Sequence, residues 1–347
     1  GGGGGGGSGG SSVKSYITAR CPECEFKCRT KKKKIITCRN CGIEYEPKKD
    51  KTKLKANAGA SKAAWEIPYE ELDMDKKIGQ GAFGIVFRGK WRMQTVAIKQ
   101  LLDKSMTQKQ FDEFYGECEL MMNLRPHKNI VQLLGICIDP NKPLCIVTDF
   151  VKCGSLYGTL MNKKQTFGWK FVVKVLEGIT AGMYHLHSEK ILHRDLAARN
   201  VLLSETYEAK VSDFGLSKKV LNPDEEKQEQ FFRGAFKYMA PESLTENVFS
   251  VKSDMWSFGV VVWEVLTRKA PFAHIDIYQA ARKIKKGSTL PTPNDCPEAV
   301  ANLLAATWCF DPTDRPTFDQ LAPHLATIAE EQSAYPKLPL AVPSKYS

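Results

Sequence analysis

The sequence predicts an α+β protein in which a small sheet-rich lobe precedes a larger helical lobe, with a short cysteine-rich unit in front of both. β-Branched and aromatic residues are concentrated in short runs that indicate strands at 84–88, 95–98 and 144–148. Apolar residues recur at a 3.6-residue spacing over 170–187 and 254–267, which indicates helices. Because the strands come first and the helices follow, we expect two lobes in that order.

Length and composition are those of an ordinary folded protein. The chain has 347 residues, of which 42% are hydrophobic and 26% charged, so fibrous and wholly disordered classes are excluded. No stretch approaches the roughly 18 uninterrupted apolar residues of a membrane-spanning helix, and the initial Gly/Ser run lacks the features of a signal peptide. We therefore expect a cytoplasmic protein with no transmembrane segment in this chain.

Changes in composition divide the chain into five segments. Residues 14–63 carry 15 Lys and Arg against 5 Asp and Glu, so most of the net charge of +11 lies there. This asymmetry indicates a basic appendage on a nearly neutral globular body. The predicted segments are a flexible Gly/Ser tether (1–12), a cysteine unit (13–47), a basic linker (48–64), the main domain (65–332) and a C-terminal tail (333–347).

A glycine-rich motif, Gly79-Gln-Gly81-Ala-Phe-Gly84-Ile-Val86, is the first sign of nucleotide chemistry. Glycines let backbone amides approach phosphate oxygens, although dinucleotide-binding folds use the same device. A dinucleotide turn would open a helix and meet an acidic residue about 20 positions later. Here a strand follows, and position 99 is a lysine at the end of the next predicted strand, where it can hold nucleotide phosphates.

Three further motifs follow in order: His193-Arg194-Asp195, Asp213-Phe214-Gly215 and Ala240-Pro241-Glu242. Together with the glycine-rich motif and Lys99, they make the chain resemble the eukaryotic protein kinases from residue 72 to about residue 331. The resemblance implies the bilobal protein kinase fold, and ATP-dependent transfer of the γ-phosphate to a hydroxyl group of a protein substrate.

The resemblance also implies roles for individual residues. Asp195 would orient the substrate hydroxyl and accept its proton, and Lys99 would bind phosphate with Glu117 as its partner. Asp213 and Asn200 would hold Mg²⁺ through oxygen atoms. The nucleotide would lie against Ile78, Gly79, Gln80, Gly81, Ala82, Phe83, Gly84, Val86, Ala97, Lys99, Thr148 and Leu202. All four of Lys99, Asp195, Asn200 and Asp213 are present, which disfavours the alternative of an inactive pseudokinase scaffold.

Markers of the acceptor hydroxyl disagree. Arg199, four residues after Asp195, resembles the arginine of tyrosine kinases, and Ala197 replaces the lysine usual in serine/threonine kinases. Tyr238 stands where tyrosine kinases usually have tryptophan, and Ala235 fits neither group. We favour tyrosine as the acceptor, with a serine/threonine kinase of the tyrosine-kinase-like group as the alternative.

The cysteine unit has the spacing of a zinc ribbon. Cys21 and Cys24 form one CxxC pair, and Cys38 and Cys41 form a second after thirteen intervening residues. Four thiolates in two such pairs can bind Zn²⁺ tetrahedrally, and the metal would replace a core that about 35 residues cannot build. The lysine run 31–34 leaves two roles open, contact with another protein or weak contact with a polyanion; a nucleic-acid-binding zinc protein is a further alternative.

Overall fold

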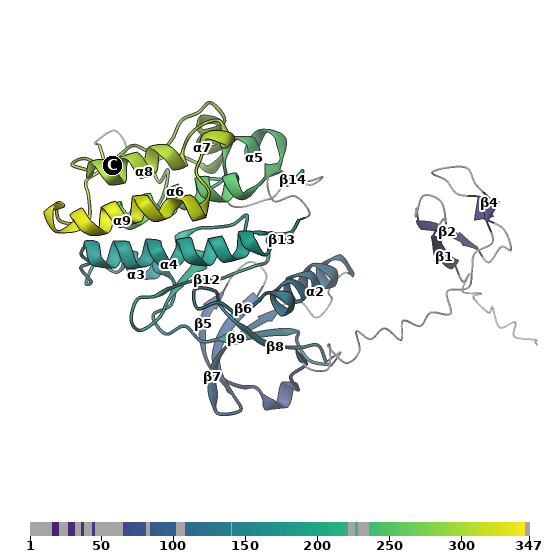
Figure 1. Ribbon diagram of the computed structural model, residues 1–347. Coiled ribbons are helices and arrows are strands. Elements are labelled where there is room, and N and C mark those ends of the chain that lie inside the picture. Colours follow the sequence, from purple (N-terminus) through teal and green to yellow (C-terminus); the bar gives the residue numbers. More distant parts are fainter. Residues whose placement is uncertain are drawn as a thin grey trace, which may run out of the picture. The chain divides into compact units, whose positions relative to one another are not determined.

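The structure is a computed structural model. It describes residues 65–80, 84–101, 108–139, 141–220 and 236–343, together with a strand at 226–227 and four short strands before residue 46. The chain divides into two compact units, residues 1–64 and residues 65–347 (Figure 1). None of the helices in the described part of the chain is long and apolar enough to cross a membrane.

The N-terminal unit contains two antiparallel hairpins. Strand β1 (Tyr16–Arg20) pairs with β2 (Lys27–Lys31), and β3 (Ile36–Thr37) pairs with β4 (Glu44–Tyr45). The four cysteines of the predicted zinc site, Cys21, Cys24, Cys38 and Cys41, lie outside the described residues.

The first lobe of the larger unit is a five-stranded antiparallel sheet in the order β5-β6-β7-β9-β8. Its strands are β5 (Asp73–Gln80), β6 (Gly84–Trp91), β7 (Gln94–Leu101), β8 (Leu133–Cys137) and β9 (Cys145–Asp149), with η1 (Tyr69–Glu71) just before β5. Three of these confirm the predicted strands. Successive side chains of a strand point to opposite faces of the sheet. Val96 and Ile98, two positions apart on β7, therefore lie on the same face, and both are fully buried.

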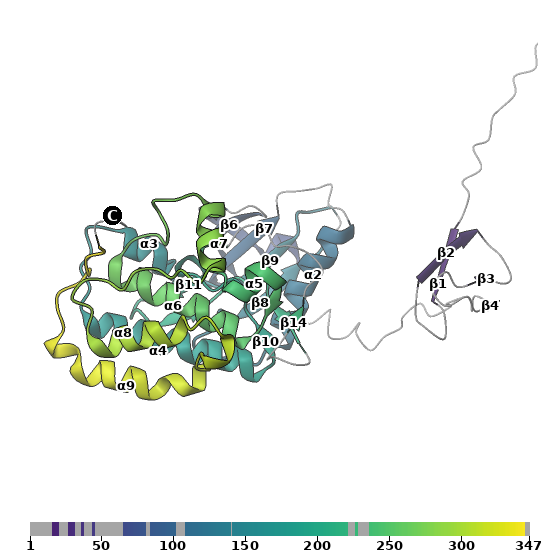
Figure 2. The same cartoon turned by 90° about the horizontal axis from the view of Figure 1, so that it is seen from above.

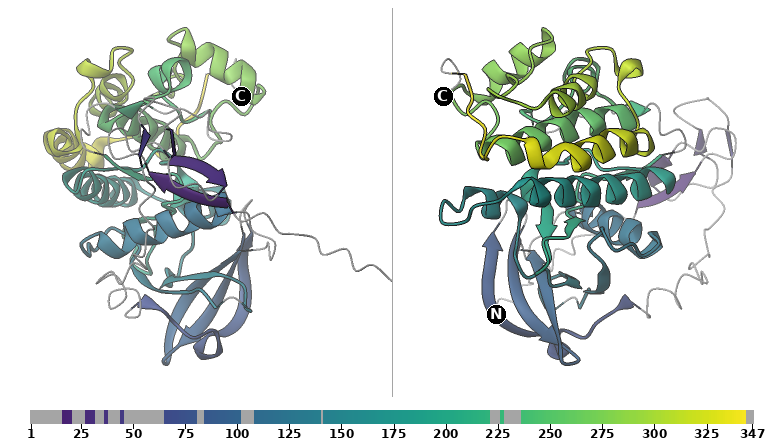
Figure 3. Two further views of the ribbon diagram at one scale, coloured as in Figure 1. Left: turned by 90° about the vertical axis from the view of Figure 1, so that its right-hand side faces the viewer. Right: turned by 60° about the vertical axis from the view of Figure 1, so that its left-hand side comes forward.

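Helix α2 (Gln108–Asn123) follows the third strand and packs near β8. Phe114, Cys118 and Met121 are buried, and their spacing of four and three positions places them on one face of the helix. Figure 3 shows α2 in blue between the strands of the sheet and the helices of the second lobe. This position lets α2 present side chains to the junction between the lobes.

The second lobe is helical, as the sequence predicts. Its helices are α3 (Leu156–Met161), α4 (Trp169–Ser188), α5 (Pro241–Glu246), α6 (Val251–Thr267), α7 (Ile277–Lys285), α8 (Glu298–Thr307) and α9 (Ala322–Glu331). Helix α6 contacts α4 and α8 (Figure 2), and every residue of it except Lys252 is buried. It is the central helix of the lobe, because it is buried around its circumference.

Short elements complete this lobe. Strand β10 (Ile191–Leu192) pairs with β13 (Lys218–Lys219), β11 (Val201–Leu203) with β12 (Ala209–Val211), and β14 (Glu226–Lys227) with β15 (Val248–Phe249). The 3-10 helices are η2 (Ala198–Asn200), η3 (Pro312–Asp314), η4 (Phe318–Leu321) and η5 (Gln332–Ala334). Residues after η5 belong to the same core: Leu340 is buried, and its amide donates to the Leu266 carbonyl at 2.8 Å.

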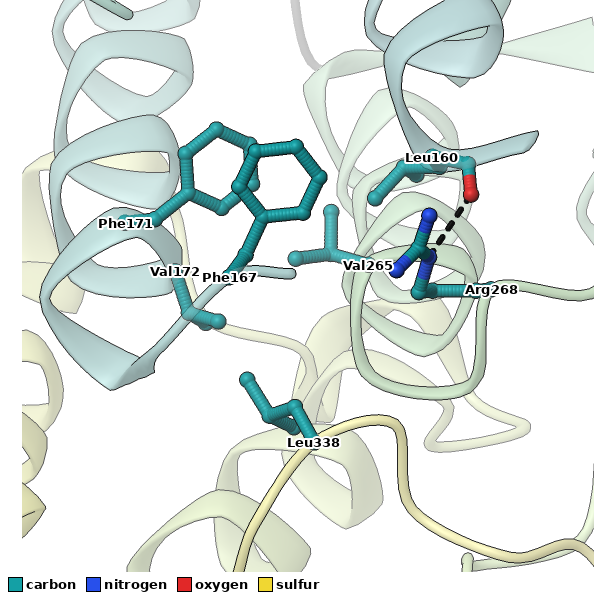
Figure 4. A pocket seen from close by; sticks show the side chains of 7 residues that line it. All are labelled: Leu160, Phe167, Phe171, Val172, Val265, Arg268 and Leu338. Atoms are coloured by element: carbon teal, nitrogen blue, oxygen red, sulfur yellow. Dashed lines mark hydrogen bonds between the residues drawn. The ribbon is translucent and has the colours of Figure 1, made fainter. Parts of the chain in front are cut away.

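Arg268 closes the C-terminal end of α6 and attaches it to the end of α3 and the segment that follows α3. It adopts a left-handed backbone conformation (φ 53°), and its guanidinium donates to the carbonyls of Leu160, Asn162 and Gln165 at 2.6–2.7 Å. Figure 4 shows the small cavity beside it, lined also by Phe167. At about 10 Å³ the cavity is at the lower limit for a single water molecule, so it is a packing defect and not a ligand site.

Candidate active site

The glycine-rich strands lie directly beside the strand that carries Lys99. In the sheet register Gly79 pairs with Val86, and Val86 pairs with Lys99. Gly84 must lack a side chain, because a Cβ atom there would collide with the backbone carbonyl of Gln100. The middle of the motif, Gly81, Ala82 and Phe83, lies outside the described residues, and Gln80 is exposed at the end of β5.

Lys99 is the centre of a charged cluster drawn from three elements. Its Nζ atom lies 2.9 Å from Glu117 Oε1 on α2 and 3.4 Å from Asp213 Oδ1 beyond β12. The structure thus pairs Lys99 with Glu117, the partner that the resemblance implies. Burial by itself would lower the pKa of Lys99, but the two carboxylates outweigh it and raise that pKa.

The two carboxylates of this cluster respond in opposite directions. Burial raises the pKa of Glu117, although Lys99 opposes the change. Burial would also raise the pKa of Asp213, but the nearby Lys99 outweighs it and the pKa falls. Asp213 has a left-handed backbone (φ 64°), a conformation that non-glycine residues rarely adopt and that concentrates at functional sites. An ionised carboxylate is therefore held at the junction of the lobes.

Asp195 is held by two neighbours in the loop before β11. Its Oδ1 accepts from Arg199 Nη2 at 2.6 Å, and its Oδ2 accepts from Asn200 Nδ2 at 2.8 Å. Burial raises the pKa of Asp195, with Arg199 opposing it. Since the Asn200 amide nitrogen also donates to the Asp195 backbone carbonyl at 2.8 Å, the side-chain oxygen of Asn200 is the atom left to bind a cation.

The loop that carries Asp195 is anchored to the central helix by Asp254, which is 1% exposed. The carboxylate of Asp254 accepts from the backbone N–H groups of His193 and Arg194 at 2.9 and 2.8 Å, and contacts His187 Nε2 at 2.9 Å. Burial opposes ionisation of this carboxyl, but His187 and the other hydrogen bonds hold its pKa below the usual range.

Residues predicted to lie against the nucleotide come from both lobes. Ala97 on β7 pairs with Thr148 on β9, and Leu202 lies on β11 in the helical lobe. Val86, Ala97, Thr148 and Leu202 are each half-buried. Ile78 at the edge of β5 is 46% exposed.

The segment after Thr148 connects the two lobes and is tied to both. Asp149 accepts from the Gln132 backbone N–H at 2.8 Å and pairs with Lys210 Nζ at 3.0 Å. An open cavity of about 720 Å³ lies at this connection and is lined by charged residues such as Lys152 and Glu205, which pair with each other. None of the predicted nucleotide-binding residues lines it.

One part of the site was not predicted from the sequence. Tyr238 donates its hydroxyl to Glu264 Oε1 at 3.0 Å, and Glu264 Oε2 accepts from the Ala198 backbone N–H at 3.2 Å. The Arg199 guanidinium lies over the Tyr238 ring, 5.0 Å from its centroid. Burial raises the pKa of Glu264 to about 7. The only signal in the sequence was an acidic residue within the apolar pattern of 254–267.

Comparison with known proteins places this geometry in a family. Residues 72–325 match the family model described as protein tyrosine and serine/threonine kinase. Tyrosine-protein kinase TXK of Homo sapiens is 40% identical over 280 residues, which cover 80% of this chain and 52% of that protein.

Other similar proteins carry both kinds of name. The probable serine/threonine-protein kinase drkD of Dictyostelium discoideum is 36% identical over 272 residues, covering 77% of this chain and 20% of that protein. The tyrosine-protein kinase transforming protein Abl of Abelson murine leukemia virus is 36% identical over 273 residues, covering 78% of this chain and 36% of that protein. This chain thus spans about a fifth to about half of the length of these relatives.

Proposed function

We propose that this chain, which belongs to the family of protein tyrosine and serine/threonine kinases, transfers the γ-phosphate of ATP to a hydroxyl group of a protein substrate. The observation that carries the proposal is the cluster in which Glu117 and Asp213 both lie within 3.4 Å of Lys99 Nζ. Phosphoryl transfer needs charge stabilisation and positioning more than covalent help, and this cluster supplies both.

Each residue of the cluster has a defined part in the proposed reaction. Glu117 holds the Lys99 ammonium toward the cleft, where its charge binds the nucleotide phosphates. Asp195 orients the substrate hydroxyl and accepts its proton, and the raised pKa of that carboxyl makes it a better base than an exposed aspartate. Arg199 holds Asp195 Oδ1 at 2.6 Å and so fixes the direction of the second oxygen.

Asp213 and Asn200 fit the Mg²⁺ that accompanies ATP. An ionised carboxylate and an amide oxygen are the hard ligands that this cation prefers, and the amide nitrogen of Asn200 is already used by Asp195. Bound Mg²⁺ would neutralise phosphate charge. The residues of this chain contribute the oxygen ligands, the lysine and the base.

Tyrosine is the acceptor that we favour. The contact of Arg199 with Asp195, 2.6 Å long, supports this choice, because the arginine at this position is the feature that resembles tyrosine kinases. Tyr238 supports the alternative of a serine/threonine acceptor, since a tyrosine there is not the residue usual in tyrosine kinases. The names of similar proteins divide between the two groups.

Phosphoamino-acid analysis tests activity and acceptor together. The purified full chain is incubated with Mg²⁺, labelled ATP and a degenerate peptide library, alongside an Asp195→Asn variant. We expect phosphotyrosine from the unmodified chain and at least a 100-fold lower rate from the variant. Label on serine and threonine alone would refute the tyrosine assignment, and absence of label from both proteins would refute the kinase activity.

We further propose that the N-terminal unit binds one zinc ion through Cys21, Cys24, Cys38 and Cys41. Strand β1 ends one residue before Cys21 and β3 ends one residue before Cys38, so each CxxC pair falls between the paired strands of a hairpin. Such a site would serve contact with another protein or, less favoured, with a polyanion.

Metal analysis of the full chain tests the zinc proposal. We expect about one zinc per chain, lost in a Cys38→Ser variant and retained in Cys28→Ser, because Cys28 lies on β2 outside the four-cysteine set. Equal zinc loss in both variants, or no zinc in the unmodified chain, would contradict it.

A further inference from the structure

Helix α7 presents an exposed, positively charged face with no carboxylate on it. Tyr278, Arg282 and Lys285 are separated by four and three positions, so they lie on one side of the helix. The opposite side, which carries Ala280 and Ile284, is buried. Tyr278 is 70% exposed, which is unusual for a large aromatic side chain in a folded lobe.

The charge of this face is not neutralised locally. Four cations are exposed at the C-terminal end of the helix and just after it: Arg282, Lys283, Lys285 and Lys286. Within the described part of the chain, none of them forms an ion pair. Asp276 at the start of the helix does not pair with these cations. Its carboxylate caps the helix and accepts from the backbone N–H groups of Tyr278 and Gln279. The negative end of the helix dipole lies near these four cations, but it offsets only about half of one elementary charge.

This face continues from the candidate active site. Tyr238, whose ring lies under the Arg199 guanidinium, is two residues from Phe236, and the Phe236 ring centroid is 6.5 Å from that of Tyr278. Lys237, which lies between Phe236 and Tyr238 in the sequence, donates to the carbonyls of Phe272 and Ile275 at 2.7 and 3.0 Å. Segment 236–238 is thereby attached to the chain that leads into α7.

We propose that the exposed face of α7 binds an acidic stretch of the protein substrate, several residues away from the hydroxyl that is phosphorylated. This inference rests on the proposed kinase function and adds the class of substrate. Figure 1 shows α7 at the edge of the helical lobe, next to α5.

The length of the helix sets the length of the stretch. Tyr278 and Lys285 are seven positions apart, a rise of about 10 Å along the helix. An extended peptide covers about 3.3 Å per residue, so about three acidic residues span the face. Exposed ion pairs are individually weak, and two or three of them together change affinity by roughly 5-fold.

Peptide kinetics test the proposal. Peptides carry the acceptor identified by phosphoamino-acid analysis and, three to ten residues from it on either side, a stretch of three Glu, three Gln or three Lys. For the unmodified chain we expect the KM of the best-placed Glu peptide to be roughly 5-fold below that of its Gln counterpart at low salt, with kcat unchanged. Added salt should reduce the difference.

Charge reversal gives the decisive comparison. In an Arg282→Glu/Lys285→Glu variant the preference should pass from the Glu to the Lys peptide, while the Gln peptide is phosphorylated as before. A Lys170→Glu/Lys337→Glu variant, with the same charge change at exposed sites elsewhere in the helical lobe, should keep the preference for Glu.

Each other outcome has a definite meaning. Equal KM values for Glu and Gln peptides in the unmodified chain would overturn the α7 proposal and leave the kinase function standing. No phosphorylation of any peptide would refute the kinase function itself. If charge reversal on α7 abolished binding to phosphatidylserine vesicles and left all peptide KM values unchanged, the face would be a membrane contact and the substrate proposal would be wrong.

Discussion

Lys99 shows how one side chain depends on partners that are far apart in the sequence. Glu117 is 18 positions away and Asp213 is 114 positions away, yet both contact the same ammonium group. The arrangement is asymmetric, because Glu117 is closer and Asp213 must also remain available for a cation. Removing the nearer partner would leave Lys99 paired with Asp213 alone.

We expect Glu117→Gln to reduce kcat/KM for ATP by roughly 10- to 100-fold, the loss of one charge-assisted hydrogen bond that positions a reacting group. Steady-state kinetics with varied ATP would measure the change. Glu119→Gln is the matched control, since Glu119 lies on the same helix but is exposed, and it should alter kcat/KM less than 2-fold. Similar losses in both variants would contradict the pairing.

Glu264 predicts a pH dependence of stability. Its carboxyl has an ordinary pKa of 4.5, and burial raises that pKa to about 7 in the folded protein, so the folded state binds the proton more tightly. The resulting stabilisation is complete below pH 4.5, declines as the pH rises, and is lost above about pH 7. It amounts to a few kcal/mol in order of magnitude.

The Glu264→Gln variant cannot titrate at this position. We expect its free energy of unfolding to fall less steeply than that of the unmodified chain between about pH 4.5 and 7. Urea unfolding at a series of pH values would measure the slope. The control is Glu298→Gln, which removes an exposed carboxyl and should leave the dependence of the free energy of unfolding on pH as it is in the unmodified chain. The prediction would be refuted if Glu264→Gln also left this dependence unchanged.

At the scale of elements, α6 organises the site although it contributes no residue of the charged cluster. Ser250 and Ser253 form a capping box that fixes where the helix begins, and Asp254 in the next position faces the loop that carries Asp195. The start of the helix thus determines which residue meets the catalytic loop. The helix itself was predictable over 254–267, and the cap extends it to Val251.

We expect Asp254→Asn to lower the free energy of unfolding by about 2–3 kcal/mol, because one acceptor oxygen becomes a donor facing a buried backbone N–H. The loop bearing Asp195 would also lose its anchor, so kcat should fall by at least 10-fold. Thermal or urea unfolding and steady-state kinetics would measure both effects. The exposed Asp319→Asn variant should match the unmodified chain in each.

The sequence predicts elements better than it predicts contacts between them. Local periodicity was enough for β6, β7, β9, α4 and α6, because alternation and helical spacing depend on neighbouring residues. The roles of Lys99, Asp195 and Asp213 came from resemblance of motifs. The bond between Tyr238 and Glu264 could not be predicted, since nothing local specifies which hydroxyl meets a buried carboxylate 26 positions away.

At the scale of the whole molecule, Arg315 holds together parts of the helical lobe that are distant in the chain. Its side chain is fully buried, and its guanidinium donates to both Glu242 oxygens at 2.6 and 2.9 Å. It donates further to the carbonyls of Lys252, Cys309 and Phe310. One cation therefore joins the starts of α5 and α6 to the loop that follows α8.

Replacing Arg315 by lysine tests whether its positive charge alone stabilises the lobe, or whether the geometry of the guanidinium is also needed. We expect Arg315→Lys to lower the free energy of unfolding by about 2–4 kcal/mol, because an ammonium group cannot reproduce the five-donor fork. The exposed Arg92→Lys variant, which keeps a surface pair with Glu71, should change it by less than about 0.5 kcal/mol. Equal unfolding midpoints for the two variants would show that charge alone suffices.

The segment that contains β14 has a consequence for regulation by phosphorylation. A β-ladder is made by main-chain atoms, so the path of the chain near Glu226 does not depend on side-chain identity there, provided that proline is avoided. Residues 218–237 contain no serine, threonine or tyrosine. A kinase that attaches regulatory phosphates to Ser, Thr or Tyr therefore finds no acceptor in this stretch.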